Sequence, residues 1–163
     1  MEQHRENKQH IGFFGRCNVG KSTLINTLIG QDIAIVSEVS GTTTDIVKKT
    51  MELKDVGAVV LIDTAGIDDK SELGKKRIEK TMEVFSLIDL AVIIISENNF
   101  SSYEKDLIKE CKRFSIPYLI VYNKQDIFPI EDNTRKEVAN YYKNLIIVSK
   151  NDISIKENLT KEL

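Results

Sequence analysis

The chain has 163 residues, the length of one ordinary domain, and we expect a single domain over residues 1–163 with a polar lead over residues 1–9. Its 41% hydrophobic and 29% charged residues exclude a disordered or fibrous protein. The formal net charge of −2 gives no sign of a nucleic-acid-binding surface. The start lacks a signal-peptide core, and no apolar stretch reaches the ~20 residues of a membrane span, so we expect a soluble cytoplasmic protein.

Strand patterns and helix patterns alternate along the chain. A buried strand is expected over residues 11–14 and a helix over residues 21–29. An alternating strand over 46–53 and a buried strand over 58–62 predict an antiparallel hairpin. Further helices are expected over 72–87, 101–114, 131–142 and 153–163, and strands over 90–95, 118–121 and 145–148. The helix over 101–114 begins with SSYE, which predicts a cap at its start. This order predicts a three-layer α/β fold: a mostly parallel six-stranded sheet with one antiparallel strand, helices on both faces, and ligands at the carboxyl ends of the strands.

Residues 15–22 read GRCNVGKS and fit the phosphate-loop pattern GxxxxGK(S/T). Between a strand and a helix, such a loop turns its backbone N–H groups and the positive end of the helix toward phosphates. Lys21 is expected to reach the β- and γ-phosphates, and the Ser22 hydroxyl to bind magnesium. A glycine-rich turn is the plainer alternative. The pattern predicts a P-loop NTPase whose nucleotide contacts come from Asn18, Val19, Gly20, Lys21, Ser22 and Thr23.

Residues 63–66 read DTAG and directly follow the buried strand of the hairpin. Asp63 can hold the magnesium shell through water, and the Gly66 N–H can contact the γ-phosphate and so report its loss. So short a motif also fits a plain turn. Its position at the carboxyl end of a buried strand, in a chain with a phosphate loop, favours a nucleotide switch.

Residues 123–126 read NKQD and follow another expected strand. The Asp126 carboxylate can accept hydrogen bonds from the N1–H and the amine of guanine, whereas adenine presents an unprotonated ring nitrogen there. Asn123 would brace the loop, and the Lys124 stem would cover the base. Ser149 and Lys150, after the last strand, are expected to complete the pocket. A solvated turn is the alternative, but the combination predicts guanine nucleotides, GTP and GDP.

The segment 40–45, SGTTTD, lies between the first helix and the hairpin. A threonine there can close over the γ-phosphate and give magnesium a second hydroxyl ligand. Thr43 is favoured and Thr42 is next. The alternative is that these threonines only begin a strand. The magnesium ligands are therefore expected to be Ser22, Thr43 and Asp63.

With these motifs in this order, the chain resembles a Ras-like G domain of the translation-factor class, in the TrmE-Era-EngA group. The strings that carry this resemblance are GRCNVGKSTLIN, SGTTTD and DTAG. Three further strings are similar to HydF, the GTPase family that helps mature FeFe-hydrogenase: QHIG at 9–12, AIVS at 34–37 before GTTTD, and ELGKKRIEK at 72–80. The resemblance implies a cytoplasmic GTPase that converts GTP to GDP and phosphate.

The resemblance also implies a potassium ion held in part by Asn18, which would stabilise charge during phosphoryl transfer. Ile67 stands where a water-orienting glutamine would be, so intrinsic hydrolysis should be slow. Glu72 or Asp69 could assist, or could only cap a helix. The residues expected to take part in catalysis are Lys21, Asn18, Thr43 and Gly66.

HydF-like proteins carry dimerisation and iron–sulfur domains after the G domain, and these C-terminal domains are expected to be absent here, so no iron–sulfur cluster is expected in this fragment. The expected partners are then the guanine nucleotide, a second G domain in a homodimer if one forms, and hydrogenase or other maturation proteins through the full-length protein. Binding to a membrane or to nucleic acid is not expected.

Two alternative functions stay open. One is an Era- or TrmE-like GTPase of ribosome or tRNA metabolism, and the other is a nucleotide-dependent interaction module with negligible turnover.

Overall fold

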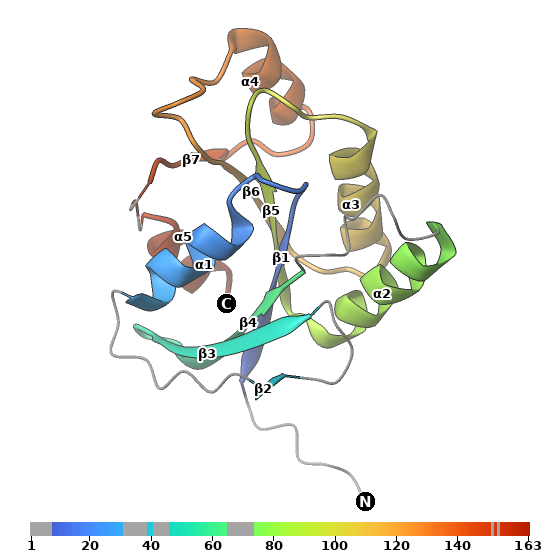
Figure 1. Ribbon diagram of the computed structural model, residues 1–163, viewed down its shortest axis with the longest axis vertical. Coiled ribbons are helices and arrows are strands. Elements are labelled where there is room, and N and C mark those ends of the chain that lie inside the picture. Colours follow the sequence, from blue (N-terminus) through green and yellow to red (C-terminus); the bar gives the residue numbers. More distant parts are fainter. Residues whose placement is uncertain (1–7, 31–38, 41–45, 65–73, 151, 153) are drawn as a thin grey trace, which may run out of the picture.

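A computed structural model describes residues 8–30, 39–40, 46–64, 74–150, 152 and 154–163 (Figure 1). The strands are β1 (Gln9–Phe14), β2 (Val39–Ser40), β3 (Val47–Leu53), β4 (Gly57–Asp63), β5 (Leu90–Ile95), β6 (Tyr118–Tyr122) and β7 (Ile146–Ile147). The helices are α1 (Lys21–Gly30), α2 (Gly74–Leu87), α3 (Ser102–Arg113), α4 (Asp132–Ala139) and α5 (Ile155–Glu162).

The described strands form one sheet in the order β2-β3-β4-β1-β5-β6-β7. From β4 to β7 all neighbouring strands are parallel, and β3 runs antiparallel to β4. The predicted mostly parallel α/β sheet with one antiparallel strand is therefore confirmed. It gains one strand beyond the six predicted, because the two residues of β2 pair with Val47 and Lys48 at the edge. So short a strand has no alternation that a sequence pattern could reveal.

Each face of the sheet has its own apolar core. Along β5 the side chains alternate between them: Leu90, Val92 and Ile94 lie in one core, and the residues between them lie in the other. The first core is covered by α1 and α5, and the second by α2, α3 and α4. Figure 1 shows α1 and α5 on one side of the sheet and α2 and α3 on the other. The three-layer arrangement follows from strands that are apolar on both faces.

The predicted helix ends agree with the structure at the start of α3 but not at the end of α4. At α3 the predicted cap is present: Ser101 and Glu104 form a capping box, with the Ser101 N–H donating to the Glu104 carboxylate at 2.8 Å. The helix expected over 131–142 ends earlier, at Ala139, with Asn140 as its C-cap. The first two residues of the helix expected over 72–87 lie outside the described residues.

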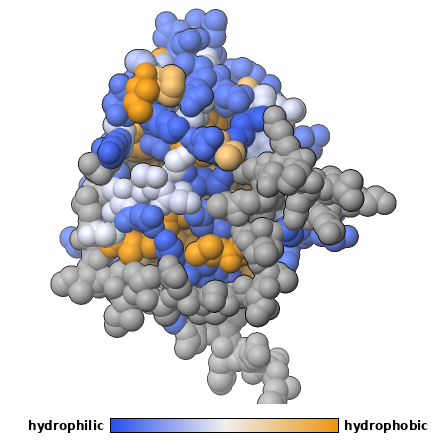
Figure 2. Space-filling view, in the orientation of Figure 1, coloured by the Kyte–Doolittle hydropathy of each residue, from blue (hydrophilic) through white to orange (hydrophobic). Residues whose placement is uncertain are grey.

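None of the helices that the structure describes has both the length and the apolar character needed to cross a bilayer. Figure 2 shows hydrophilic side chains over much of the described surface on this face, with apolar residues in small groups.

Candidate nucleotide-binding site

The phosphate loop, residues 15–20, joins the end of β1 to the start of α1 at the carboxyl edge of the sheet. Gly20 has φ +95°, and a Cβ atom there would lie 2.5 Å from Nδ2 of Asn123. A Cβ on Gly15 would lie 2.6 Å from the carbonyl oxygen of Ile94 in β5. Glycine at these two positions therefore lets the loop approach the ends of neighbouring strands, where any side chain would collide.

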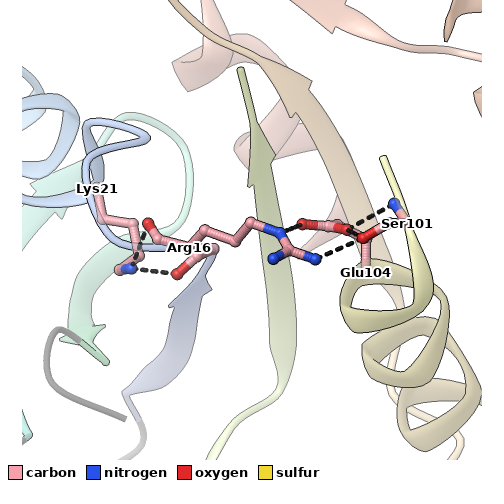
Figure 3. Close-up of polar contacts among 5 residues, drawn as sticks. Arg16, Lys21, Ser101 and Glu104 are labelled. Atoms are coloured by element: carbon pink, nitrogen blue, oxygen red, sulfur yellow. Dashed lines mark hydrogen bonds and ion pairs between the residues drawn. The ribbon is translucent and has the colours of Figure 1, made fainter. Parts of the chain in front are cut away.

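Lys21 begins α1 with its side chain only 6% exposed. Its ammonium donates hydrogen bonds to the carbonyl of Gly15 and, at 3.2 Å, to that of Arg16 (Figure 3). The cation thus lies inside the turn of the phosphate loop, beside the backbone groups that a phosphate would contact.

Ser22, the residue after Lys21, contacts Asp63 at the end of β4. The Ser22 hydroxyl donates to the Asp63 carboxylate at 2.6 Å, and Asp63 is 6% exposed at the end of β4. The next residue, Thr64, is anchored because its hydroxyl donates to the carbonyl of Phe13 at 2.6 Å. A hydroxyl oxygen and a carboxylate oxygen side by side are the hard ligands that Mg²⁺ prefers, so the residues present fit that ion.

The base loop, residues 123–126, follows β6 and lies directly against the phosphate loop. The buried Asn123 side chain donates to the carbonyl of Val19 at 3.0 Å. Lys124 has φ +62°, and its ammonium donates to the carbonyl of Asn18 and lies 3.8 Å from the Glu97 carboxylate. The two loops are therefore fastened together by side chains of the base loop and carbonyl groups of the phosphate loop.

A pocket of about 160 Å³ opens where these loops meet. It collects most of the residues predicted to contact the base, and the exposed Asp126 is among them. The lining residues are Gly20, Thr23, Leu24, Thr27, Asn123, Lys124, Asp126, Ile127, Ser149, Lys150 and Asp152. They come from the phosphate loop, α1, the base loop with the residue after it, and the segment after β7, which matches the ligand position expected at the carboxyl ends of parallel strands.

A family model described as a 50S ribosome-binding GTPase matches residues 10–124, from β1 into the base loop. The chain belongs to this GTPase family. The match covers the phosphate loop, Asp63 and Asn123, and it confirms the predicted enzyme class and the binding of guanine nucleotide that defines it.

Two curated GTPases show the same relationship. GTPase Der of Clostridium perfringens is 35% identical over 141 residues, which are 83% of this chain and 31% of that protein. The tRNA modification GTPase MnmE of Legionella pneumophila is 39% identical over 116 residues, 69% of this chain and 26% of that protein. The chain therefore spans less than a third of the length of these relatives. They place it among GTPases of the Era, TrmE and Der class, as the motifs predicted.

Solved structures show the same fold at lower identity. Era of Aquifex aeolicus superposes with a TM-score of 0.68 at 23% identity, over 93% of this chain and 54% of that one. The G domain of the T. maritima FeoB iron transporter gives a TM-score of 0.66 at 19% identity, over 95% and 96% of the two chains. The Ras-like G-domain fold of this GTPase is thus confirmed.

Some predicted residues of the GTPase site lie outside the described part of the structure. These are Thr43 with its neighbour Thr42, Gly66, Ile67, Asp69 and Glu72. Their assigned roles stay predictions. The described residues predicted for the site all lie either in the phosphate loop and the first turn of α1, at Asp63, or along the pocket.

Sequence reasoning missed several residues of this GTPase domain that the structure brings to the site. Thr27 lies on the same face of α1 as Thr23, four residues earlier, and this spacing could have identified it. Ile127 and Asp152 also line the pocket, but no pattern in the sequence marks them. Arg16 was treated as a variable position of the loop pattern, yet its side chain is bound to Glu104 of α3. Only the fold brings these two together.

Proposed function

We propose that this chain is the GTP-hydrolysing switch of a larger protein, slow on its own and stimulated by potassium. The observation that carries the proposal is that the phosphate loop, the base loop and the Ser22–Asp63 pair meet at one edge of the sheet. Free thiols at Cys17 and Cys111 are in keeping with a reducing cytoplasm.

Asp126 is proposed to select guanine. Its carboxylate is exposed along the pocket, where a guanine edge could donate two hydrogen bonds to it. The Lys124 side chain crosses from the base loop to the carbonyl of Asn18, so its stem lies over one side of the pocket. Ser149 and Lys150 line another part of the wall and would approach the base from the end of β7.

Magnesium would be held by Ser22 and, directly or through water, by Asp63, with Thr43 as the proposed third residue. When bound, the ion neutralises charge on the phosphates during phosphoryl transfer. Lys21 would leave the loop carbonyls to contact the β- and γ-phosphates, and the Gly66 N–H would contact the γ-phosphate. Ser22 and Asp63 are joined by a hydrogen bond, and Lys21 is the residue next to Ser22 at the start of α1.

Potassium is proposed to bind next to Asn18. Asn18 is exposed at φ +67°, and its backbone is fixed because its carbonyl accepts from Lys124. Its side-chain oxygen is a suitable ligand for a monovalent cation that stabilises developing charge. GTP turnover should therefore be about tenfold faster in potassium than in sodium chloride, and Asn18→Ala should remove the difference. Equal turnover in the two salts, with GDP binding intact, would count against this role.

For the cellular process, the comparisons favour ribosomal or transfer RNA. The family model is described by 50S ribosome binding, one relative is named for tRNA modification, and a similar Era structure contains part of 16S ribosomal RNA. The test is co-sedimentation of the full-length protein with purified 50S subunits, in a non-hydrolysable GTP analogue and in GDP. Binding that depends on the nucleotide would support the proposal. Absence of binding in both states would contradict a role on the 50S subunit, and the same test with 30S subunits decides whether a small-subunit role remains.

A second candidate is maturation of FeFe-hydrogenase, which the HydF-like strings at residues 9–12, 34–37 and 72–80 favour. This role requires the full-length protein to carry an iron–sulfur cluster in a part beyond the G domain. Anaerobic reconstitution with iron and sulfide, followed by absorbance and EPR spectra, would separate it from an RNA-directed role. A homodimer of G domains would be detected by comparing molecular mass with and without a GTP analogue.

A further inference from the structure

Arg16 extends out of the phosphate loop toward α3 instead of toward the phosphate side of the loop. Its Nε donates to the Glu104 carboxylate at 2.8 Å, and its terminal nitrogen donates to the Ser101 hydroxyl at 2.5 Å. Its guanidinium also lies 5.1 Å from the centre of the Tyr103 ring. Figure 3 shows Arg16 crossing from the loop to the start of α3, on the opposite side of its own backbone from Lys21.

Glu104 is a buried carboxylate, only 1% exposed. One of its oxygens accepts from Arg16, and the other accepts from the backbone N–H of Ser101 at 2.8 Å as part of the capping box. A buried charge is tolerated when a partner and hydrogen bonds satisfy it. The start of α3 is therefore a built receptor for one arginine, and that arginine comes from the phosphate loop.

The backbone of the same residue organises the phosphate loop. The Arg16 carbonyl accepts a hydrogen bond from Lys21 Nζ at 3.2 Å and another from the Val19 N–H at 3.3 Å. A shift of Arg16 would therefore move both the lysine and the turn that presents the loop N–H groups. The side chain fixes that position from α3, which is 88 residues away in the sequence.

We propose that Arg16 and Glu104 are positioning residues for phosphate binding: the ion pair between Arg16 and the buried Glu104 carboxylate fastens the phosphate loop to the N-terminus of α3. It neutralises the arginine, so the guanidinium is not drawn to the nucleotide, and it holds the Arg16 carbonyl where Lys21 and Val19 use it. This inference rests on the proposed nucleotide binding by the loop and is independent of the potassium proposal.

The test compares Arg16→Gln, Glu104→Gln, the double variant and the gentler Arg16→Lys in the whole 163-residue chain. The controls are Arg113→Gln and Glu110→Gln, which remove an ion pair of 3.4 Å at the far end of the same helix. The readouts are the Kd values of Mg·GDP and of GMP, the rate of GTP turnover, and urea unfolding without nucleotide. GMP lacks the β-phosphate that the loop is expected to hold, so it reports base recognition.

Each single variant should weaken GDP binding about tenfold while GMP affinity stays within about twofold. The double variant should be no weaker than the singles, because both remove the same link. Arg16→Lys should lose less GDP affinity than Arg16→Gln. Lysine keeps the positive charge but lacks the two guanidinium nitrogens that bind Glu104 and Ser101 at the same time. The two control variants should match the wild type.

Three results would overturn the inference. Folded variants with unchanged GDP affinity would show that the pair does not position the loop, and parallel losses for GDP and GMP would show a general structural role. Faster GTP turnover in Glu104→Gln would show that Glu104 restrains an arginine that acts on phosphate itself. A wild-type chain that binds no GDP would reject the nucleotide proposal together with this one, and so differs from the other three.

Discussion

The phosphate loop and the base loop start from the same position in the fold but are held by different means. Both follow a buried parallel strand, β1 and β6, at the carboxyl edge of the sheet. The shape of the phosphate loop requires glycine, since a Cβ on Gly20 would collide with Asn123. The base loop depends on side chains, since Asn123 and Lys124 reach out and bond to its neighbour.

This difference makes the two loops depend on each other. Asn123 Nδ2 donates to the Val19 carbonyl across 104 residues of sequence, and Gly20 leaves the space in which that amide lies. In these contacts the phosphate loop contributes backbone carbonyl groups, those of Val19 and Asn18, and the side chains come from the base loop. Substitutions where the two loops touch should weaken the binding of both the phosphates and the base. Substitutions in either loop away from this contact should weaken the binding of only one of them.

The largest effect is expected from Gly20→Ala, which fills the contact between the loops. The new Cβ would lie 2.5 Å from Asn123 Nδ2, at a backbone φ of +95° that alanine rarely adopts. Affinity for GDP and for GMP should both fall about a hundredfold or more. Isothermal titration calorimetry measures both constants.

Gly30→Ala is the matched control for this substitution. Gly30 ends α1, the helix that directly follows Gly20, and a Cβ there meets nothing within 4 Å. Its nucleotide affinity should equal that of the wild type. If Gly20→Ala weakened GDP but spared GMP, the two loops would be independent and the comparison would fail.

A smaller effect is expected from Asp126→Asn at the outer end of the base loop. The amide can no longer accept two hydrogen bonds from guanine with a full negative charge, so the preference for GTP over ATP should fall about thirtyfold. Competition of each triphosphate against a fluorescent GDP measures this ratio. Asp106→Asn, an exposed substitution on α3, is the control. An unchanged ratio in Asp126→Asn would remove Asp126 from base recognition.

Much of the fold was predictable because its signals are local. The all-apolar strands β5 and β6, the antiparallel hairpin and the capping box at Ser101 and Glu104 each lie within a short window of sequence. Two-residue strands such as β2 carry no such signal. The end of α4 at Ala139 was also missed, because the aromatic residues that follow it continue an apolar pattern without continuing the helix.

The candidate site divides in the same way. The loops themselves were marked by motifs, and the pocket gathers Gly20, Thr23 and Asp126 as expected from strand order. The links between loops were not predictable, because they join residues about a hundred positions apart. The Arg16–Glu104 pair is the clearest case: Glu104 was expected only to cap α3, and the structure shows that its second oxygen holds the phosphate loop.

The smallest effect is expected on the rate at which a thiol reagent labels Cys17 in the phosphate loop, with the buried Cys111 as the reference. Cys17 is exposed in the phosphate loop, while burial in α3 raises the pKa of the Cys111 thiol to about 12. At pH 8 a thiol reagent should therefore label Cys17 in the folded chain and spare Cys111, which reacts only after unfolding in urea. Because its raised pKa lies far above pH 10, Cys111 should stay unlabelled at that pH as well.

Of the two cysteines, only Cys17 should change its rate of labelling by the thiol reagent when a nucleotide binds. Mg·GDP, which orders the phosphate loop, should slow labelling about threefold or more, whereas saturating guanosine should leave the rate unchanged, because it has no phosphate. Mass spectrometry of the labelled peptides gives both rates in one sample, with Cys111 as the internal control. Equal protection by guanosine would mean that filling the base pocket alone orders the phosphate loop through Asn123 and Lys124. The two loops would then be one binding unit, and their difference would lie only in how each is held.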